Sequence, residues 1–483
     1  MIDNLRFAMA VGLVGVLCQA ESPCHAESPV PAPREWLLMV DDHWIESHEN
    51  VRRVLQQPVK HPGNPLIHGD QPWARHPYCY GTVLYDKPTS KFQLWYMSYN
   101  QGYPLQDRTP VLYATSGDGV AWQRPPLGLF EFRGSRENNI VLSHYGHHDL
   151  YSPSVVRDDR ELDPRRRYKM VWWDFPKGPQ GYQDDGMCVG FSPDGIHWEK
   201  YAGNPVLPAL QRERSISDVM SVMYDSRAEK FVVYAKGWAE PWPAFRQIVR
   251  TESTDFVHWT EPEVVLRHAF NEQDPQSYGM VVSQYESVYL GLLCSYKKPG
   301  NETIDIQLAI SHDNRNWARV ADQTTFLPLG PAGSWDDGML FCAPLLVHGD
   351  EVRLYYGGWD GPHNTKARSA GIGLATLAKD RFVSLQATAN PGIVTTRLFA
   401  PVDARRRLHV NAHAEGGSVR AAVLDESGEP IAGYRAEDCI PLRADGLHQT
   451  VAWQGGNELP RGRALRFRFV LDSAALYALC LEP

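Results

Sequence analysis

Acidic side chains recur at equivalent places in the chain, just before runs of alternating residues that have the pattern of strands. They are Asp149, Asp218, Asp274 and the neighbours Asp336 and Asp337. A single Asp at the junction of a loop and a strand usually caps a turn, but recurrence at equivalent places indicates a shared site. Crowding separates the pKa values of carboxyl groups, and hydrolysis of a glycosidic bond uses one carboxylic acid and one carboxylate. We therefore predict Asp149, Asp218, Asp274 and Asp337 as catalytic residues.

Aromatic and polar side chains accompany these carboxylates and could bind a sugar. Tryptophan rings stack on sugar rings, although a place in the core is the usual explanation for any one of them. The predicted substrate-binding residues are Trp73, His76, His148, Trp335 and Asp336. The histidines around His148 match no zinc-binding spacing, so the sequence predicts no metal site there.

A turn motif, Ser-x-Asp, recurs between the strand-like segments. Its copies are Ser116–Trp122, Ser192–Trp198, Ser253–Trp259 and Ser311–Trp317. An Asp-Gly pair after alternating residues is typical of a hairpin, and a repeat of strands and turns indicates a β-propeller. Since an enzyme needs one active site, whereas every repeat needs a turn, we interpret these turns as structural.

Each turn is preceded by two further strand-like segments, such as 80–86 and 92–97 in the first unit. Five such units predict an all-β chain with a five-bladed β-propeller over residues 64–390, in which Lys379–Phe382 replaces the turn of the fifth unit. Four blades with one decayed unit is the alternative. Residues 27–63 would supply strands that close the propeller.

The pattern changes after residue 390. Alternating segments joined by Gly-rich turns predict a C-terminal antiparallel β-sandwich over 391–483. In a propeller the innermost strands begin around a central channel, where pockets form, so the predicted carboxylates would meet there. No cofactor is required, although a Ca²⁺ ion in the propeller channel is compatible with such a ring of carboxylates.

Composition and the N-terminus restrict the class of protein further. The formal net charge of −9 argues against a nucleic-acid partner. Residues 1–26 combine a charged start, an apolar run and small residues, which predicts a signal peptide and a secreted or periplasmic product. No later apolar run could span a membrane, and the six cysteines beyond this segment have neither zinc nor redox spacing.

Several motifs carry a resemblance to a known group of proteins. They are Leu38–Asp42, Pro58–Pro65, Tyr113–Gly119, Leu354–Gly358 and Pro391–Gly392. The chain resembles five-bladed propeller glycosidases related to glycoside hydrolase families 43 and 32, and more closely a group of exported bacterial glycosidase-like proteins. The resemblance covers nearly all of the mature chain, and it identifies the scaffold rather than the substrate.

The resemblance implies three acidic residues, one from each of the first three blades, acting as base or nucleophile, as transition-state stabiliser and as acid. By position, Asp149 and Asp218 match two of them. The first blade has Ala74 where the relatives tend to carry Glu after Pro-Trp. Either other blades complete the catalytic set, or this chain has lost activity.

Three functions follow from these observations. The first is a secreted glycoside hydrolase that acts on a plant or algal polysaccharide or oligosaccharide through paired carboxylates. The second, favoured by Ala74, is a non-catalytic carbohydrate-binding propeller. The third is a structural protein of the cell envelope, which predicts a channel mouth without a polar pocket.

Overall fold

The computed structural model describes residues 29–178, 185–209, 215–238, 245–267, 275–298, 300–365, 367–401 and 404–483. Within these ranges the regular elements are β-strands, apart from 3-10 turns at Leu105–Asp107, Pro164–Arg166 and Ala321–Gln323. The fold is therefore all-β, as predicted. The predicted signal peptide lies outside the described residues, and no helix in the described ranges is long and apolar enough to cross a membrane.

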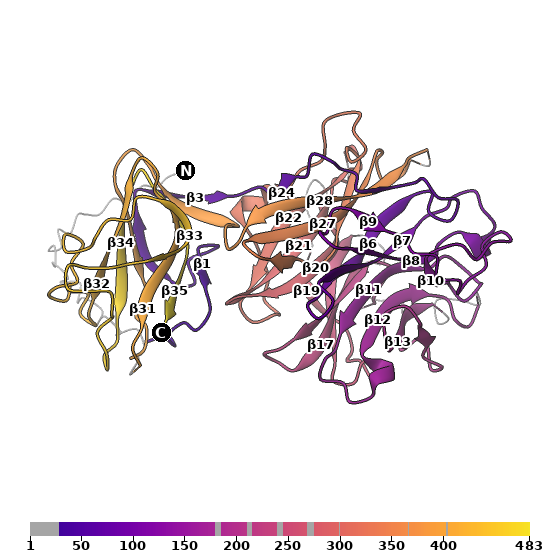
Figure 1. The fold of residues 1–483 in the computed structure, drawn as a ribbon, viewed down its shortest axis with the longest axis horizontal. Coiled ribbons are helices and arrows are strands. Elements are labelled where there is room, and N and C mark those ends of the chain that lie inside the picture. The colour runs from indigo at the N-terminus through magenta and orange to yellow at the C-terminus, as the bar shows by residue number, and fades with distance from the viewer. Residues whose placement is uncertain are drawn as a thin grey trace, which may run out of the picture.

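The strands form two groups, which lie side by side in Figure 1. The larger group contains β4 to β28, and the smaller group combines β1–β3 with β29–β35. The larger group is a series of antiparallel units, each built on three main strands that pair in chain order. In the last unit the short strand β26 intervenes between the first and the second of them in the sequence. Many of these strands, such as β21 and β22, are buried along their whole length, which explains their continuous apolar runs.

The first three units are separate sheets. Their strands are β6 (Pro77–Asp86), β7 (Lys91–Ser98), β8 (Val111–Ser116), β9 (Trp122–Gln123) and β10 (Ile140–Leu142); β11 (Tyr151–Arg157), β12 (Tyr168–Asp174), β13 (Gly186–Ser192), β14 (Glu199–Lys200) and β15 (Leu207–Pro208); and β16 (Met220–Asp225), β17 (Lys230–Trp238), β18 (Arg246–Ser253) and β19 (Glu263–Leu266).

The last two units are joined through a parallel pairing of Ile304 with Met339. Their strands are β20 (Gln276–Tyr285), β21 (Val288–Tyr296), β22 (Ile304–Ser311), β23 (Ala318–Arg319) and β24 (Thr325–Leu327); and β25 (Met339–Cys342), β26 (Leu346–His348), β27 (Glu351–Trp359) and β28 (Ala370–Ala378). The short strands β4 (Val59–Lys60) and β5 (Ile67–His68) pair with β28.

The first strands of the units contact one another in succession. β6 contacts β11, β11 contacts β16, and β16 contacts β20. The succession continues through β22 to β25, and both β25 and β27 contact β6. The last unit thus returns to the first, and the starts of these strands converge.

The Ser-x-Asp turns have the same internal hydrogen bonds in all four copies. In the first copy, the backbone N–H groups of Val120 and Ala121 donate to Asp118 Oδ1, both at 2.8 Å. In the other three copies, Asp194, Asp255 and Asp313 each accept hydrogen bonds from two backbone N–H groups of their own turn. The residue after the Asp has a positive φ in each turn: 78° at Gly119, 78° at Gly195, 69° at Phe256 and 62° at Asn314.

Three of the turns also hold neighbouring units together. Trp95 Nε1 in β7 donates to the Gly195 carbonyl at 2.6 Å, and Tyr234 in β17 donates to the Asn314 carbonyl at 3.0 Å. Tyr355 in β27 donates to the Gly119 carbonyl at 2.9 Å, which connects the last unit to the first. These contacts confirm the structural role predicted for the turns.

The smaller group consists of two sheets, with strand orders β3-β29-β35-β31-β33 and β2-β30-β34-β32; β1 pairs with β35. Side chains of both sheets share one apolar cluster, which includes Val410, Phe467 and Leu479. The strands are β1 (Leu37–Leu38), β2 (Ile45–Glu49), β3 (Val51–Leu55), β29 (Val383–Ala387), β30 (Gly392–Thr396), β31 (Arg407–His413), β32 (Ser418–Leu424), β33 (Asp445–Thr450), β34 (Arg466–Asp472) and β35 (Ala475–Glu482).

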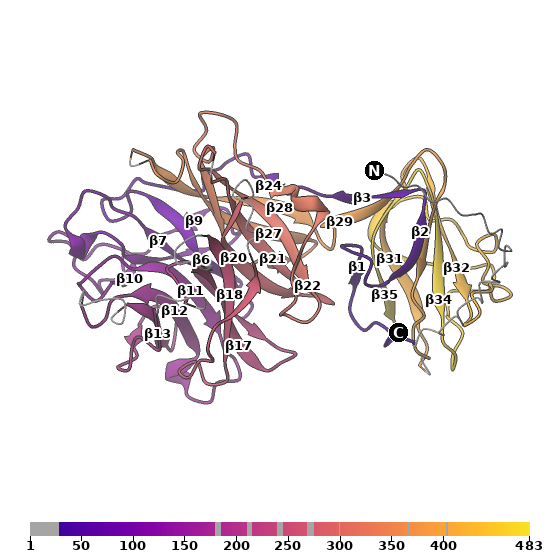
Figure 2. The same cartoon turned by 180° about the vertical axis from the view of Figure 1, so that it is seen from behind.

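The N-terminal segment divides between the two groups. Figure 2 shows β1 and β2 among the C-terminal strands, with β3 running toward the larger group. Of the strands expected to close the propeller, β4 pairs with β28, whereas β1, β2 and β3 pair with β35, β30 and β29. Residues 37–40 alternate between the two groups: Leu37 and Met39 pack in the C-terminal cluster, while Leu38 and Val40 pack in the main cluster of the larger group.

Candidate active site

A pocket of about 210 Å³ lies where the first strands of the units converge. Each of the five units contributes to its wall: Tyr78 from β6, Tyr151 from β11, Asp218 just before β16, Tyr278 from β20 and Phe341 from β25. The remaining lining residues are Tyr80, Tyr99, Met339, Trp359, His363 and Arg368. The pocket is therefore largely aromatic, with a carboxylate, an imidazole and a guanidinium in its wall.

Asp218 is the carboxylate that lines this pocket. Lys236 Nζ lies 2.6 Å from its Oδ1, and Ser217 Oγ donates to the same oxygen at 2.7 Å. Burial raises the pKa of Asp218, but the charge of Lys236 and the hydrogen bonds from Lys236 and Ser217 outweigh burial, so that the pKa is lowered overall. Asp218 is ionised at neutral pH and suited to act as a base or nucleophile.

Asp149 lies behind the pocket wall. Its side chain is buried, its Oδ1 is 3.0 Å from Arg108 Nε, and its Oδ2 is 3.5 Å from the hydroxyl of Tyr151. Burial, followed by the charges of nearby groups that include Asp149 and Asp218, raises the pKa of Tyr151. Tyr151 therefore stays protonated and stands close to two of the predicted catalytic carboxylates, Asp149 and Asp218.

The other predicted catalytic residues are placed differently. Asp274 lies outside the described residues. Asp337 Oδ2 accepts a hydrogen bond from the Gly333 N–H at 2.6 Å, and the side chain is not among those that line the pocket. Of the described predicted catalytic residues, Asp218 lines the pocket and Asp149 contacts the lining residue Tyr151, whereas the side chain of Asp337 closes its own loop.

Asp336 and Trp335 belong to a buried arrangement away from the pocket lining. Asp336 Oδ2 is 2.6 Å from Lys60 Nζ and accepts a hydrogen bond from Tyr356 at 3.0 Å. The Trp335 ring stacks on Tyr356 with 5.5 Å between ring centroids. Both residues hold β4 and β27 together, so the structure favours a packing role over the predicted substrate contact.

Of the remaining predicted binding residues, Trp73 packs away from the pocket, and His76 and His148 lie next to residues that line it. Trp73 donates to Asn139 Oδ1 at 2.7 Å and packs against an apolar cluster that does not include the pocket. His76 stacks at 6.0 Å on Trp359, a lining residue. The His148 ring lies 4.5 Å from Phe175 and 6.5 Å from Tyr151. His76 and His148 thus stand next to the pocket wall.

Sequence reasoning missed the tyrosines and the basic residues of the pocket. Tyr78, Tyr151 and Tyr278 lie near the starts of their first strands, so counting back from the Ser-x-Asp turns would have found them. His363 and Arg368 come from the loop between β27 and β28, the same connection that in the first unit supplies Tyr99 between β7 and β8. His363 Nε2 and the Tyr278 hydroxyl form a hydrogen bond of 2.8 Å.

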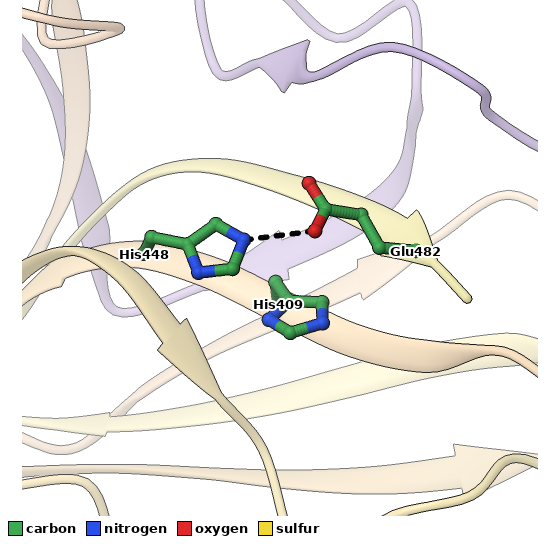
Figure 3. A group of neighbouring side chains, drawn as sticks. All are labelled: His409, His448 and Glu482. Carbon is green, nitrogen blue, oxygen red and sulfur yellow. Dashed lines mark hydrogen bonds and ion pairs between the residues drawn. The ribbon is translucent and has the colours of Figure 1, made fainter. Parts of the chain in front are cut away.

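A potential metal-binding group lies elsewhere, in the C-terminal strands. His409, His448 and Glu482 offer ligand atoms within 4.8 Å of one another, and within the described ranges theirs is the group that meets this spacing. Figure 3 shows that the His448 Nε2 points to Glu482, at 3.0 Å, while the two imidazole rings stack 4.3 Å apart. Stacked rings do not aim their nitrogens at one point, so we assign no metal to this group.

The comparisons with known proteins concern the fold. No family model matches the chain, and no curated protein is detectably similar in sequence. Among solved structures, an N-acetylgalactosamine deacetylase from F. plautii in complex with blood group B trisaccharide is 16% identical with a TM-score of 0.47, over 68% of this chain and 96% of that one. A glycosyl hydrolase from Bacteroides ovatus is 14% identical with a TM-score of 0.46, over 68% and 95%.

A glycoside hydrolase family 43 arabinoxylan arabinofuranohydrolase from Bacillus subtilis, in complex with cellotetraose, is similar over a longer part of the chain. It is 13% identical with a TM-score of 0.41, over 88% of this chain and 99% of that one. Glycoside hydrolases are thus among the solved structures similar to this chain, the class of protein that its sequence motifs resemble. Likeness at this level assigns no activity.

Proposed function

We propose that the chain is a secreted glycoside hydrolase built on a five-bladed β-propeller over residues 64–390, with a β-sandwich over 391–483. The succession of contacts from β6 to β25 and back supports the propeller. The apolar cluster shared by the two C-terminal sheets supports the sandwich. Export of the mature protein to the periplasm or beyond rests on the pattern of residues 1–26.

The observation that carries the proposal is the pocket where the five units converge. It combines the ionised Asp218 with aromatic rings that can stack on a sugar and with protonated tyrosine hydroxyls that can donate hydrogen bonds to it. Its volume of about 210 Å³ is below the roughly 300–1,000 Å³ of pockets for drug-sized ligands. The substrate is therefore a terminal sugar unit of a poly- or oligosaccharide.

In this proposal Asp218 is the base or nucleophile, because Lys236 keeps it ionised. Asp149 is the second carboxylate, since it stands behind Tyr151 in the same wall. The tyrosines position the sugar. Glycosidic bond hydrolysis needs such a pair, and the separation of the two carboxyl groups decides between retention and inversion.

A carbohydrate-binding protein without catalytic activity is the second candidate. Its support is that both carboxylates at the pocket have cationic partners, Asp218 with Lys236 and Asp149 with Arg108. A glycosidase also needs a protonated acid, and Ala74 is fully buried in the first unit, where the resemblance calls for a carboxylate.

The test is a glycan screen with three proteins: wild type, Asp218→Asn and Asp337→Asn. We expect wild type to release a terminal sugar, Asp218→Asn to lose at least about 10²–10⁴-fold in kcat/KM as for other acid–base residues, and Asp337→Asn to retain activity. Circular dichroism checks that each variant is folded. Full activity of folded Asp218→Asn would overturn the assignment, and glycan binding by wild type without any released product would establish the second candidate.

A further inference from the structure

Three positively charged side chains gather at one wall of the pocket. Lys236 Nζ lies 4.8 Å and Arg246 Cζ 5.2 Å from the centroid of the Tyr278 ring, so two cations stand on one lining residue. Arg368 lines the pocket itself, with its Cζ 4.7 Å from the centroid of Trp359. These three side chains, from β17, β18 and the loop before β28, are called the basic wall below.

Among the described residues, the carboxylates that border this wall form no direct ion pair with its two arginines. Asp218 is paired with Lys236. Two more carboxylates border the wall and are held by neutral donors: Asp360 by the Ser369 N–H at 2.6 Å and Glu302 by Asn364 Nδ2 at 2.6 Å. One charge of the wall is therefore matched by a direct ion pair in the described part of the chain.

The two arginines are held by neutral acceptors. Arg246 Nη1 donates to Gln276 Oε1 at 2.9 Å, and its buried Nε has no hydrogen-bond partner among the described groups. Arg368 Nη1 donates to the carbonyls of Pro362 and His363 at 2.9 and 2.7 Å. Both guanidinium groups are thus held in place while their charges remain uncompensated by a carboxylate in these contacts.

Burial and all three side chains of the basic wall lower the pKa of His363. Burial is the main cause that lowers the pKa of this imidazole, and Arg246, Arg368 and Lys236 lower it further, against a hydrogen bond with Asn364 that raises it. His363 lines the pocket next to Arg368. The positive charges therefore act on the space that a ligand would occupy.

We propose that the basic wall binds the negative charge of an acidic sugar, either the carboxylate of a uronic acid or a sulfate ester. Guanidinium groups bind both planar carboxylates and tetrahedral oxyanions through paired hydrogen bonds. Arg368 contacts the anion, while Lys236 and Arg246 contribute positive potential from behind Tyr278. The inference rests on a carbohydrate ligand and names the class of sugar.

The test measures calorimetric binding of matched sugars to the full mature protein. The probes are glucuronic acid, glucose 6-sulfate and glucose, and we expect at least one acidic sugar to bind ten-fold or more tightly than glucose. A preference for glucuronic acid identifies a uronate site, and a preference for glucose 6-sulfate identifies a sulfate site. Equal affinity for all three overturns the inference.

Variants locate the site. Arg368→Gln and Arg246→Gln, which remove charges on different elements, should each reduce the preference for the acidic sugar about ten-fold. The control Arg165→Gln, at an exposed arginine paired with Asp163, should leave it unchanged. An undiminished preference in both folded wall variants overturns the inference.

The outcomes separate this inference from the proposed hydrolase. Acidic-sugar binding without hydrolysis in the glycan screen keeps the basic wall and overturns the hydrolase. Hydrolysis of neutral glycans that requires Asp218, together with equal binding of acidic and neutral sugars, keeps the hydrolase and overturns the basic wall.

Discussion

Gly119 stands at the junction between the first and last units, and replacing it with alanine should weaken that junction. Its φ of 78° lies in the left-handed region, and a Cβ there would collide with the hydroxyl of Tyr355. That hydroxyl donates to the Gly119 carbonyl at 2.9 Å, and Arg353 Nη1 donates to the Asp118 carbonyl at 2.6 Å. The substitution therefore strains the turn and displaces the donors from the last unit.

The magnitude follows from these two effects. A left-handed conformation costs a residue with a Cβ about 1–2 kcal/mol, and loss of a hydrogen bond costs about 0.5–1.5 kcal/mol. Gly119→Ala should thus lower the free energy of unfolding by about 1.5–3.5 kcal/mol. The matched control is Gly117→Ala in the same turn, because a Cβ at Gly117 would meet nothing within 4 Å.

The assay is urea denaturation of both variants, followed by tryptophan fluorescence and compared at equal slope. Gly117→Ala should stay within about 0.5 kcal/mol of wild type, as surface substitutions usually do. If Gly119→Ala were as stable as Gly117→Ala, the turn would not hold the first and last units together, and the structural explanation of the repeated motif would be wrong.

Three further predictions concern stability and reactivity. Burial alone raises the pKa of Asp194, but hydrogen bonds from His197 and Ile196 outweigh it and lower the pKa from 3.8 to about 2; a lowered carboxyl pKa stabilises the fold above the unfolded value and ceases to do so below the folded one. The stability deficit of Asp194→Asn should accordingly shrink as pH falls from about 4 to 2, and a constant deficit in pH-dependent denaturation would contradict this. Lys169 is buried between Asp158 at 3.1 Å and Glu161 at 3.0 Å, so Lys169→Met should cost about 3–5 kcal/mol in denaturation experiments, with partial recovery on adding Asp158→Asn. The cysteines of the described chain are free and buried, so a thiol reagent such as DTNB should react with them after denaturation and not in the native protein; rapid native labelling would show that the sheets open.

Features whose hydrogen bonds join residues close together in the sequence could be predicted. The Ser-x-Asp turns form their hydrogen bonds within a few residues, from Ser116 to Ala121 in the first copy, so their structure and spacing could be inferred from the sequence. That spacing also located Asp218, which lines the pocket, and Asp149, which lies behind the lining residue Tyr151.

The pairing of strands that are far apart in the sequence could not be predicted in the same way. Leu37 and Leu38 are both buried and differ only in which cluster they face, so alternation alone could not assign β1 to β35 rather than to the larger group of strands. Asp336 and Asp337 are neighbours in sequence. Asp336 pairs with Lys60 from the start of the chain, while Asp337 caps its own loop, and neither side chain lines the pocket.

The sequence by itself determined the all-β class, the repeated turn and the approximate position of two carboxylates, because period-two alternation and turn chemistry depend on neighbouring residues. Only the tertiary structure decided what surrounds those carboxylates. Lys236 becomes the partner of Asp218 across paired strands, and Arg368 reaches the pocket from the loop between β27 and β28 of the last unit. The physical reason is that charge and burial at a site come from side chains that folding assembles from segments far apart in the sequence.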